Sequence, residues 1–215
     1  MIFFRETEQL KKKLLMLSAL VEEDVRDALR AIRNRDRELA NEVISADNEI
    51  DAMEIEVEED CLKILALHQP VARDLRFIVA VLKMTSDLER IGDLALNIAE
   101  RALYLADHPH VAIPDKISTL AEKAVLMLKK SLDALVNLDG PLAVEVCSLD
   151  DEVDTLYSEM YVLVRDEILH TPSDIDGLLT LLSVSRYLER IADHATNIAE
   201  DVIYIVDGEI MRHKL

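Results

Sequence analysis

Hydrophobic residues recur at helical intervals of three and four along most of the chain. Near the N-terminus this apolar stripe is formed by Leu10, Leu14, Leu17, Val21, Val25, Ala28 and Ile32. Such spacing places the apolar side chains on one face of an amphipathic helix. Only four glycines and five prolines punctuate the 215 residues. The pattern therefore predicts an all-α protein built from few, long helices rather than many short strands.

Short polar segments divide this pattern into six expected helices. The dividing segments are residues 34–36, 68–70, 107–114, 139–141 and 170–174. A proline in the first turn, with Asp or Ser ahead of it, is a typical helix start. Several helices are then about 30 residues long, well above the globular average of about 11–12, which favours an extended bundle. The longest dividing segment, 107–114, is the predicted boundary between two halves, residues 1–110 and 111–215.

The two halves repeat each other in sequence. Residues 88–100, LERIGDLALNIAE, return as residues 188–200, LERIADHATNIAE, and differ only at Gly92, Leu94 and Leu96. A weaker match pairs residues 47–51, DNEID, with residues 150–154, DDEVD, and the His-x-Pro turns at 68–70 and 170–172 also correspond. We interpret this as duplication of one three-helix unit, which predicts two tandem three-helix bundles.

Each half carries a matched set of acidic residues. On the expected second and third helices of each half, two carboxylates stand four residues apart. The four pairs are Asp47 and Asp51, Glu89 and Asp93, Asp150 and Asp154, and Glu189 and Asp193. This spacing stacks both carboxylates on one helix face. Because like charges so placed repel, each pair destabilises its helix unless a cation neutralises it.

The same pairs are expected to face each other across the bundle. A short turn makes the second and third helices antiparallel, so residues at equal height are equally distant from the middle of the turn. Residue 47 then faces 93 and 51 faces 89, while 150 faces 193 and 154 faces 189. The sequence predicts two sites of four carboxylates at the edge of the apolar stripe. Further candidate ligands continue the third helices: Asn97, Glu100, Asn197 and Glu200.

Ligand sets made only of oxygen favour Mg, Mn, Ca and Fe over Zn and Cu. Four or more carboxylates leave room for more than one ion at each site. The alternative is that the acids form a solvated face, as we interpret the run 54–60, because charged residues are mostly exposed. His194, where the other half has Leu94, is interpreted as a helix-surface histidine, with an extra metal ligand in the second site as the alternative. The Glu-x-x-His spacing at 167–170 lies at a helix end and is taken as a coincidence.

Composition and charge narrow the function classes. The formal net charge is −19 and no concentrated basic face is apparent, so nucleic-acid binding is not expected. The acidity suits cation binding or partners with basic surfaces, or simply solubility. Cys61 and Cys147 are isolated, as expected of reduced thiols in a cytosolic protein. The early charges argue against a signal peptide, and no run of about 18 apolar residues predicts membrane insertion.

The duplicated motif Glu-Arg-Ile-x-Asp-x-x-x-Asn-Ile-Ala-Glu, with Asp-x-x-x-Asp upstream, resembles the PhoU family of phosphate-transport accessory and regulatory proteins. The resemblance covers nearly the whole chain. It implies two three-helix bundles, each with a multinuclear metal cluster, usually described as iron, with Mn, Mg or Zn as further candidates. It also implies a cytoplasmic protein, commonly a homodimer, that reaches the inner face of the membrane only through its partners. Those partners would be the ATPase subunit of a phosphate ABC transporter and a sensor histidine kinase.

Three functions stay open at this point. The first is a negative regulator of phosphate-starvation signalling that acts through partner binding and is not an enzyme. The second is a carboxylate-bridged multinuclear metal enzyme, an oxidase or a phosphoesterase, and the third is a scaffold with solvated acids. Di-iron enzymes supply Glu-x-x-His motifs from two helices, whereas no histidine is duplicated here. No phosphate loop, nucleophile elbow or kinase signature occurs either, so the sequence favours the regulator.

Overall fold

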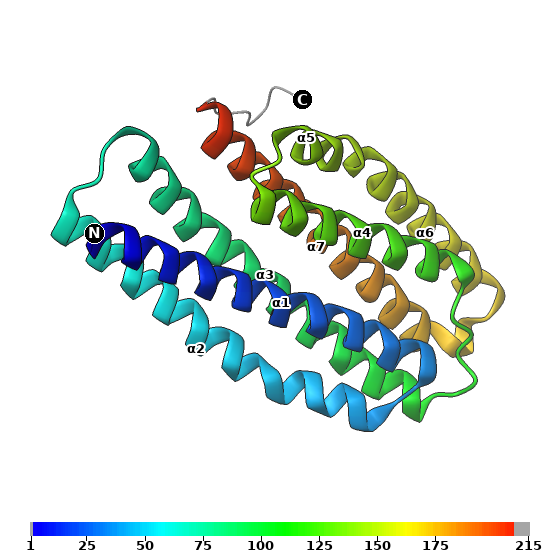
Figure 1. Cartoon of the computed structure of the whole chain (residues 1–215). Coiled ribbons are helices and arrows are strands. Elements are labelled where there is room, and N and C mark those ends of the chain that lie inside the picture. Colours follow the sequence, from blue (N-terminus) through cyan, green and yellow to red (C-terminus); the bar gives the residue numbers. More distant parts are fainter. Residues whose placement is uncertain (1, 209–215) are drawn as a thin grey trace.

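Two antiparallel helical bundles lie side by side in the computed structural model, which describes residues 2–208 (Figure 1). The first bundle holds α1 (Ile2–Asn34), α2 (Arg37–His68) and α3 (Ala72–Asp107). The second holds α4 (Asp115–Asn137), α5 (Gly140–Ser148), α6 (Asp150–His170), the 3-10 turn η1 (Pro172–Asp174) and α7 (Ile175–Asp207). The predicted all-α class and tandem arrangement are confirmed, and the described residues contain no strand.

The helices end in the predicted polar segments for identifiable reasons. The side chain of Asp36 accepts a hydrogen bond from the Leu39 amide and caps α2, and Asp139 caps α5 in the same way through Leu142. Such caps satisfy amides that have no partner within the helix. Gln69 ends α2 in the left-handed conformation, with φ of 45°.

One predicted helix is interrupted. Residues 140–170 form α5 and α6 rather than one helix, and Leu149 lies between them. Its amide bonds to the carbonyl of Val146 at 3.0 Å, three residues back, and this shorter repeat tightens the turn and redirects the chain. Asp150 thereby becomes the first residue of α6 instead of a residue within a long helix.

The two third helices, α3 and α7, form the centre of the molecule. They pack against each other, and the remaining helices of each half cover their outer faces (Figure 1). Leu88 and Leu188 are fully buried, as are Ile98 and Ile198; each such side chain contributes roughly 1.5–3 kcal/mol through burial. The acidic residues of the duplicated motif therefore stand on the most firmly packed helices of the fold.

Polar contacts join the two halves at several points. Lys83 of α3 pairs with the buried Asp201 of α7 at 3.0 Å. Arg35, which follows α1 with φ of 53°, donates hydrogen bonds to the carbonyl of Leu105 in the last turn of α3 and to those of His108 and Val111 in the linker. These bonds fix the path from the first half to the second. Within residues 2–208, no helix has the length and apolarity needed to cross a membrane.

Candidate metal centres

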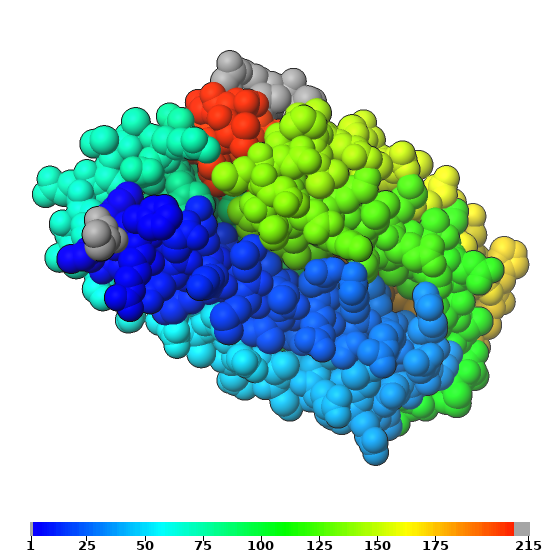
Figure 2. All heavy atoms as spheres, viewed as in Figure 1, coloured from blue at the N-terminus to red at the C-terminus, as the bar shows by residue number. Residues whose placement is uncertain are grey.

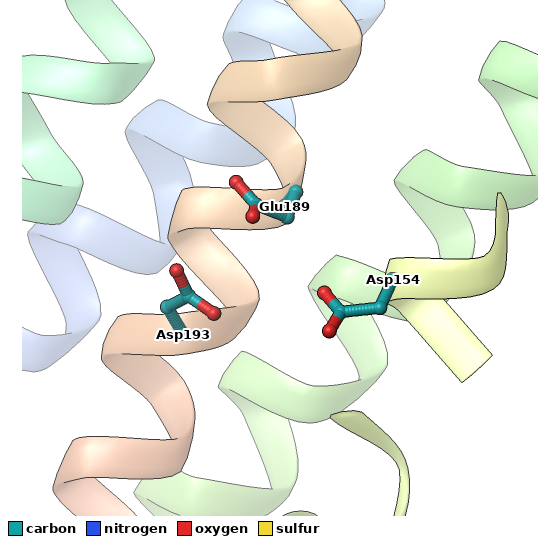
Figure 3. A group of neighbouring side chains, drawn as sticks. All are labelled: Asp154, Glu189 and Asp193. Atoms are coloured by element: carbon teal, nitrogen blue, oxygen red, sulfur yellow. The ribbon is translucent and has the colours of Figure 1, made fainter. Parts of the chain in front are cut away.

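Three carboxylates of the second half converge on one point. Asp154 of α6 and Glu189 and Asp193 of α7 each offer an oxygen atom, and these atoms all lie within 4.8 Å of one another. Figure 3 shows Glu189 and Asp193 one turn apart on α7, with Asp154 projecting toward them from α6. Glu189 is half-buried, whereas the two aspartates are exposed, so the group is open to water and to ions.

The fourth predicted member of this group, Asp150, lies beside it rather than in it. Its carboxylate accepts a hydrogen bond from the Thr196 hydroxyl at 3.2 Å. The negative charge of Asp150 raises the pKa of Asp193, and among the causes of that rise only burial is larger. Asp150 therefore borders the trio and is held by a neutral donor on α7.

Burial and mutual repulsion act together on these acids. Burial is the main cause of the raised pKa values of Asp150, Glu189 and Asp193, and neighbouring carboxylates add to it. Arg190 opposes the shift at Glu189 and Asp193. Crowded carboxylates of this kind favour either a bound proton or a bound cation.

In the first half the predicted quartet is also brought together, but more loosely. Asp47 of α2 has a pKa raised by burial and then by the charges of Asp51 and Asp93. Glu89 of α3 has a pKa raised by burial and by Asp93, with Asp51 adding to it. The carboxylates thus lie close enough across α2 and α3 to repel one another. In the described part of the chain, only the trio of the second half meets the 4.8 Å separation.

An arginine forms ion pairs with two acids of the first group. The side chain of Arg90 lies 3.5 Å from a carboxylate oxygen of Glu89 and 3.8 Å from one of Asp93. It partly neutralises the pair and opposes, without cancelling, the rise in the pKa of Glu89 that burial and Asp93 cause. Because the guanidinium is 57 % exposed, an incoming cation can displace it at little cost.

The remaining predicted ligands have other partners. The Asn97 amide donates to the carbonyl of Asp93 one turn earlier, and the Asn197 amide donates to Asp87 on the other bundle. Glu100 is exposed. Glu200 is half-buried and lies near Cys147, whose pKa is raised to about 11 by burial and then by the charges of Glu200 and Asp150. These four residues surround the carboxylate groups without joining the trio.

Two residues that the sequence did not assign to a site add to the first group: Asp24, and Glu54, which the sequence placed in a solvated face. Asp24 of α1 is half-buried, and its pKa is raised to about 6 by burial and by nearby acids that include Asp47. Glu54 is half-buried and contributes to the raised pKa of Glu89. The position of Asp24 between the core residues Val21 and Val25 was the available signal, because a carboxylate there is drawn inward by the apolar stripe.

His194 is not the surface histidine that the sequence suggested. Its ring Nδ1 lies 2.7 Å from a carboxylate oxygen of Asp87, and only 17 % of its side chain is exposed. The histidine faces the other bundle instead of the trio. The donor set around the trio is therefore made of oxygen alone, which suits Fe, Mn or Mg better than Zn.

Comparison with known proteins identifies the family. A family model described as the PhoU domain matches residues 14–102 and 117–202. The phosphate-specific transport system accessory protein PhoU of Serratia marcescens is 36% identical over 211 residues, covering 98% of this chain and 87% of that protein. The PhoU homolog of Aquifex aeolicus is 40% identical over 214 residues, covering 100% and 97%.

Solved structures agree with the sequence relatives. The crystal structure of PhoU from Pseudomonas aeruginosa superimposes with a TM-score of 0.93 at 37% identity, covering 96% of this chain and all of that one. The phosphate transport system regulatory protein PhoU from Streptococcus pneumoniae gives a TM-score of 0.86 at 30% identity, covering 97% of this chain and 98% of that one. The likeness extends over both bundles.

Proposed function

The chain belongs to the PhoU family, and on this premise we propose that it is a metal-binding cytoplasmic regulator of phosphate uptake and phosphate-starvation signalling. The observation that supports the regulatory role is the match along nearly the whole chain to proteins named as accessory proteins of the phosphate-specific transport system. Its partners would be the ATPase subunit of a phosphate ABC transporter and the sensor histidine kinase. It would hold the starvation response down while phosphate is plentiful, without turnover of its own.

The metal part of the proposal rests on the convergence of Asp154, Glu189 and Asp193. A cation bound there would neutralise the crowded carboxylates and tie α6 to α7. The corresponding acids of the first half would tie α2 to α3. Iron is the proposed native metal, in clusters of more than one ion, and Asp150 and Asp47 would complete the sites from the second helices. The chain's own contribution is to hold the acids at fixed heights on packed helices.

The enzyme alternative has less support. Within residues 2–208, the carboxylate trio includes no histidine or cysteine. Glu167 and His170, the only Glu-x-x-His pair weighed from the sequence, are exposed at the end of α6, where they bond to Thr171 and to a backbone carbonyl. The geometry favours a site that changes the stiffness and charge of the bundle over one that performs a reaction.

The proposed function is tested in cells and on purified protein. Deleting the gene should raise expression of phosphate-scavenging functions in phosphate-rich medium. Tagged protein from the same strain should co-purify with the transporter ATPase or the kinase, should contain metal, and should behave as a homodimer. Unchanged expression after deletion, together with recovery of neither partner, would refute the regulatory role. Turnover of aryl phosphates, or of Fe(II) with oxygen, would instead favour the enzyme.

A further inference from the structure

A groove with an unusual charge lies between the C-terminal half of α1 and the N-terminal half of α4. It encloses about 250 Å³ and is lined by Arg26, Leu29, Arg30, Arg33, Ala121, Glu122 and Val125. Figure 2 shows this face, with a hollow between the light-blue end of α1 and the green residues of α4. The groove lies where the two bundles meet, and its walls come from both of them.

Its rim is basic in a strongly acidic protein. Arg26, Arg30 and Arg33 are spaced by four and three residues and so share one face of α1. They meet a single acid among the lining residues, Glu122, while the whole chain carries a formal charge of −19. The sequence showed no concentrated basic face because these arginines are interrupted along the chain and gather only on the folded helix.

The arginines are available to a partner. Arg26 pairs with Glu22 and Arg30 with Asp27, each at 2.6 Å within α1. The two arginine side chains are 49 % and 64 % exposed, while their partners Glu22 and Asp27 are each 24 % exposed. Because the arginine end of each pair lies in solvent, the pair contributes little stability. No ion pair joins Arg33 to another described residue. An incoming carboxylate can therefore replace these contacts at small cost.

The needs of the fold account for only part of this cluster. A cation in the last turn of a helix is stabilised by the helix dipole, and this explains Arg33. Arg26 and Arg30 lie further from the helix end, where that effect has faded. The ion pairs of Arg26 and Arg30 stay within α1. By contrast, Arg35 and Arg37 just beyond bond to other parts of the chain, the linker carbonyls and Asp107.

The floor of the groove is apolar and would add hydrophobic contacts to those of the arginines. Leu29, Ala121 and Val125 form an apolar strip, and the neighbouring Leu126 is 44% exposed. An apolar strip flanked by cations fits the apolar face of an amphipathic helix with acidic flanks. An anionic membrane is disfavoured, because the charge of −19 repels its surface. Salt screens charges beyond about 8 Å, so a short acidic segment in the groove would interact mainly with the nearby arginines.

We propose that this groove receives an acidic amphipathic helix of a partner protein. The inference rests on the proposed function, because it names the surface through which the transporter ATPase or the kinase would be held. Arg26, Arg30 and Arg33 would contact the acids of that helix, and Leu29 and Val125 its apolar residues. The groove is separate from the carboxylate groups, so docking and metal binding use different residues.

The first test uses the full chain and a labelled synthetic helix. The peptide carries Leu at i, i+3, i+4 and i+7 with Glu beside the leucines, and a matched peptide carries Lys in place of Glu. The wild type should bind the Glu peptide, and R26E/R30E/R33E should weaken binding by about tenfold or more. The control K12E/K63E/R165E, which makes the same charge change at exposed cations elsewhere, should stay within about twofold. Circular dichroism should show the same helix content in all three proteins.

The outcomes separate the inference from its alternatives. If both triple variants weakened binding of the Glu peptide equally, the groove would not be the binding site, since the net charge of the protein would then explain the binding. Equal binding of the Lys peptide, or binding to phosphatidylglycerol vesicles instead of the Glu peptide, would overturn the acidic helix. A pull-down with the ATPase subunit and the kinase runs in parallel. If all three proteins recover a partner equally, the groove is wrong and the proposed function stands. If the wild type recovers neither partner and gene deletion also leaves expression unchanged, the proposed function fails, and the peptide assay alone decides whether the groove binds an acidic helix.

Discussion

His194 of α7 contacts Asp87 of α3 across the boundary between the two bundles, with 2.7 Å between the ring nitrogen and the carboxylate oxygen. Asn197 donates to the same oxygen at 3.2 Å. The repeat does not reproduce this contact in reverse, because Leu94 and Tyr187 stand at the corresponding positions. The duplicated helices are therefore joined by an asymmetric polar contact next to the carboxylate trio.

Replacing His194 by Leu, as in the other half, should destabilise the protein by about 1–2 kcal/mol. The change leaves the half-buried carboxylate of Asp87 with Asn197 as its remaining side-chain donor, and a buried acceptor that loses a partner carries a desolvation cost. Denaturant unfolding at neutral pH measures the loss. His170→Leu, at an exposed histidine, serves as the control. If the loss were the same in an Asp87→Asn background, the His194–Asp87 contact would not be its cause.

Arg35→Gly should also destabilise the protein, by about 1–3 kcal/mol, although glycine suits the positive φ at this position. The substitution removes the hydrogen bonds from the guanidinium to the carbonyls of Leu105, His108 and Val111. The linker should then become more sensitive to proteolysis. Gln69→Gly is the matched control, because Gln69 is exposed and has φ of 45°; it should be neutral or slightly stabilising. Equal effects at the two positions would contradict the structural role of Arg35.

The helices were predictable because their signals are local. The hydrophobic period and capping residues such as Asp36 and Asp139 act within one or two turns, so the helices and their ends can be predicted from the sequence. The break at Leu149 was missed because no proline or glycine marks it. It depends on how α5 and α6 pack on α7, and packing against another helix leaves no local pattern.

The candidate ligands were predictable for a different reason. Antiparallel helices joined by a short turn fix the height of each residue, so facing carboxylates such as Asp154 and Glu189 follow from numbering alone. Contacts between the two halves do not follow from residue numbering. The sequence therefore offered no basis for predicting that His194 and Asn197 contact Asp87 on α3. The arginines of the α1 groove form no basic run in the sequence, because acidic and apolar residues separate them along the chain and they come together only on one face of the helix.

Asp24→Asn should stabilise the metal-free protein at pH 7.5 by about 1–2 kcal/mol, a value reduced from the full pKa shift because the group is only half-buried. The pKa of Asp24 is raised from 3.8 to about 6 by burial and neighbouring acids. Between these values the folded protein holds more protons than the unfolded chain, so this group lowers stability as pH rises through the window. The gain should therefore vanish near pH 4. Denaturant midpoints at both pH values measure it, and Asp133→Asn, at an exposed aspartate of α4, is the control. A gain that did not depend on pH would contradict the assignment to Asp24.

The carboxylate trio gives the last prediction, that Glu189→Gln with Asp193→Asn removes metal from the second half and leaves the first half loaded. Each group is complete within its own repeat, and Asp150 and Asp154 by themselves offer too few ligands to hold an ion. The metal-free variant should be slightly more stable than the wild type, by about 0.2–0.5 kcal/mol, because repulsion between acids one turn apart is relieved. Added Fe(II) or Mn(II) should raise the melting temperature of the wild type more than that of the variant, since an ion bound only to the folded state stabilises it. Metal content per chain and melting with and without metal are measured on both proteins. Asp166→Asn with Glu167→Gln removes the same charge from the exposed end of α6 and should change neither quantity. If the variant keeps the full metal content, the trio is not a metal site, and if it loses all metal, the two halves do not bind independently.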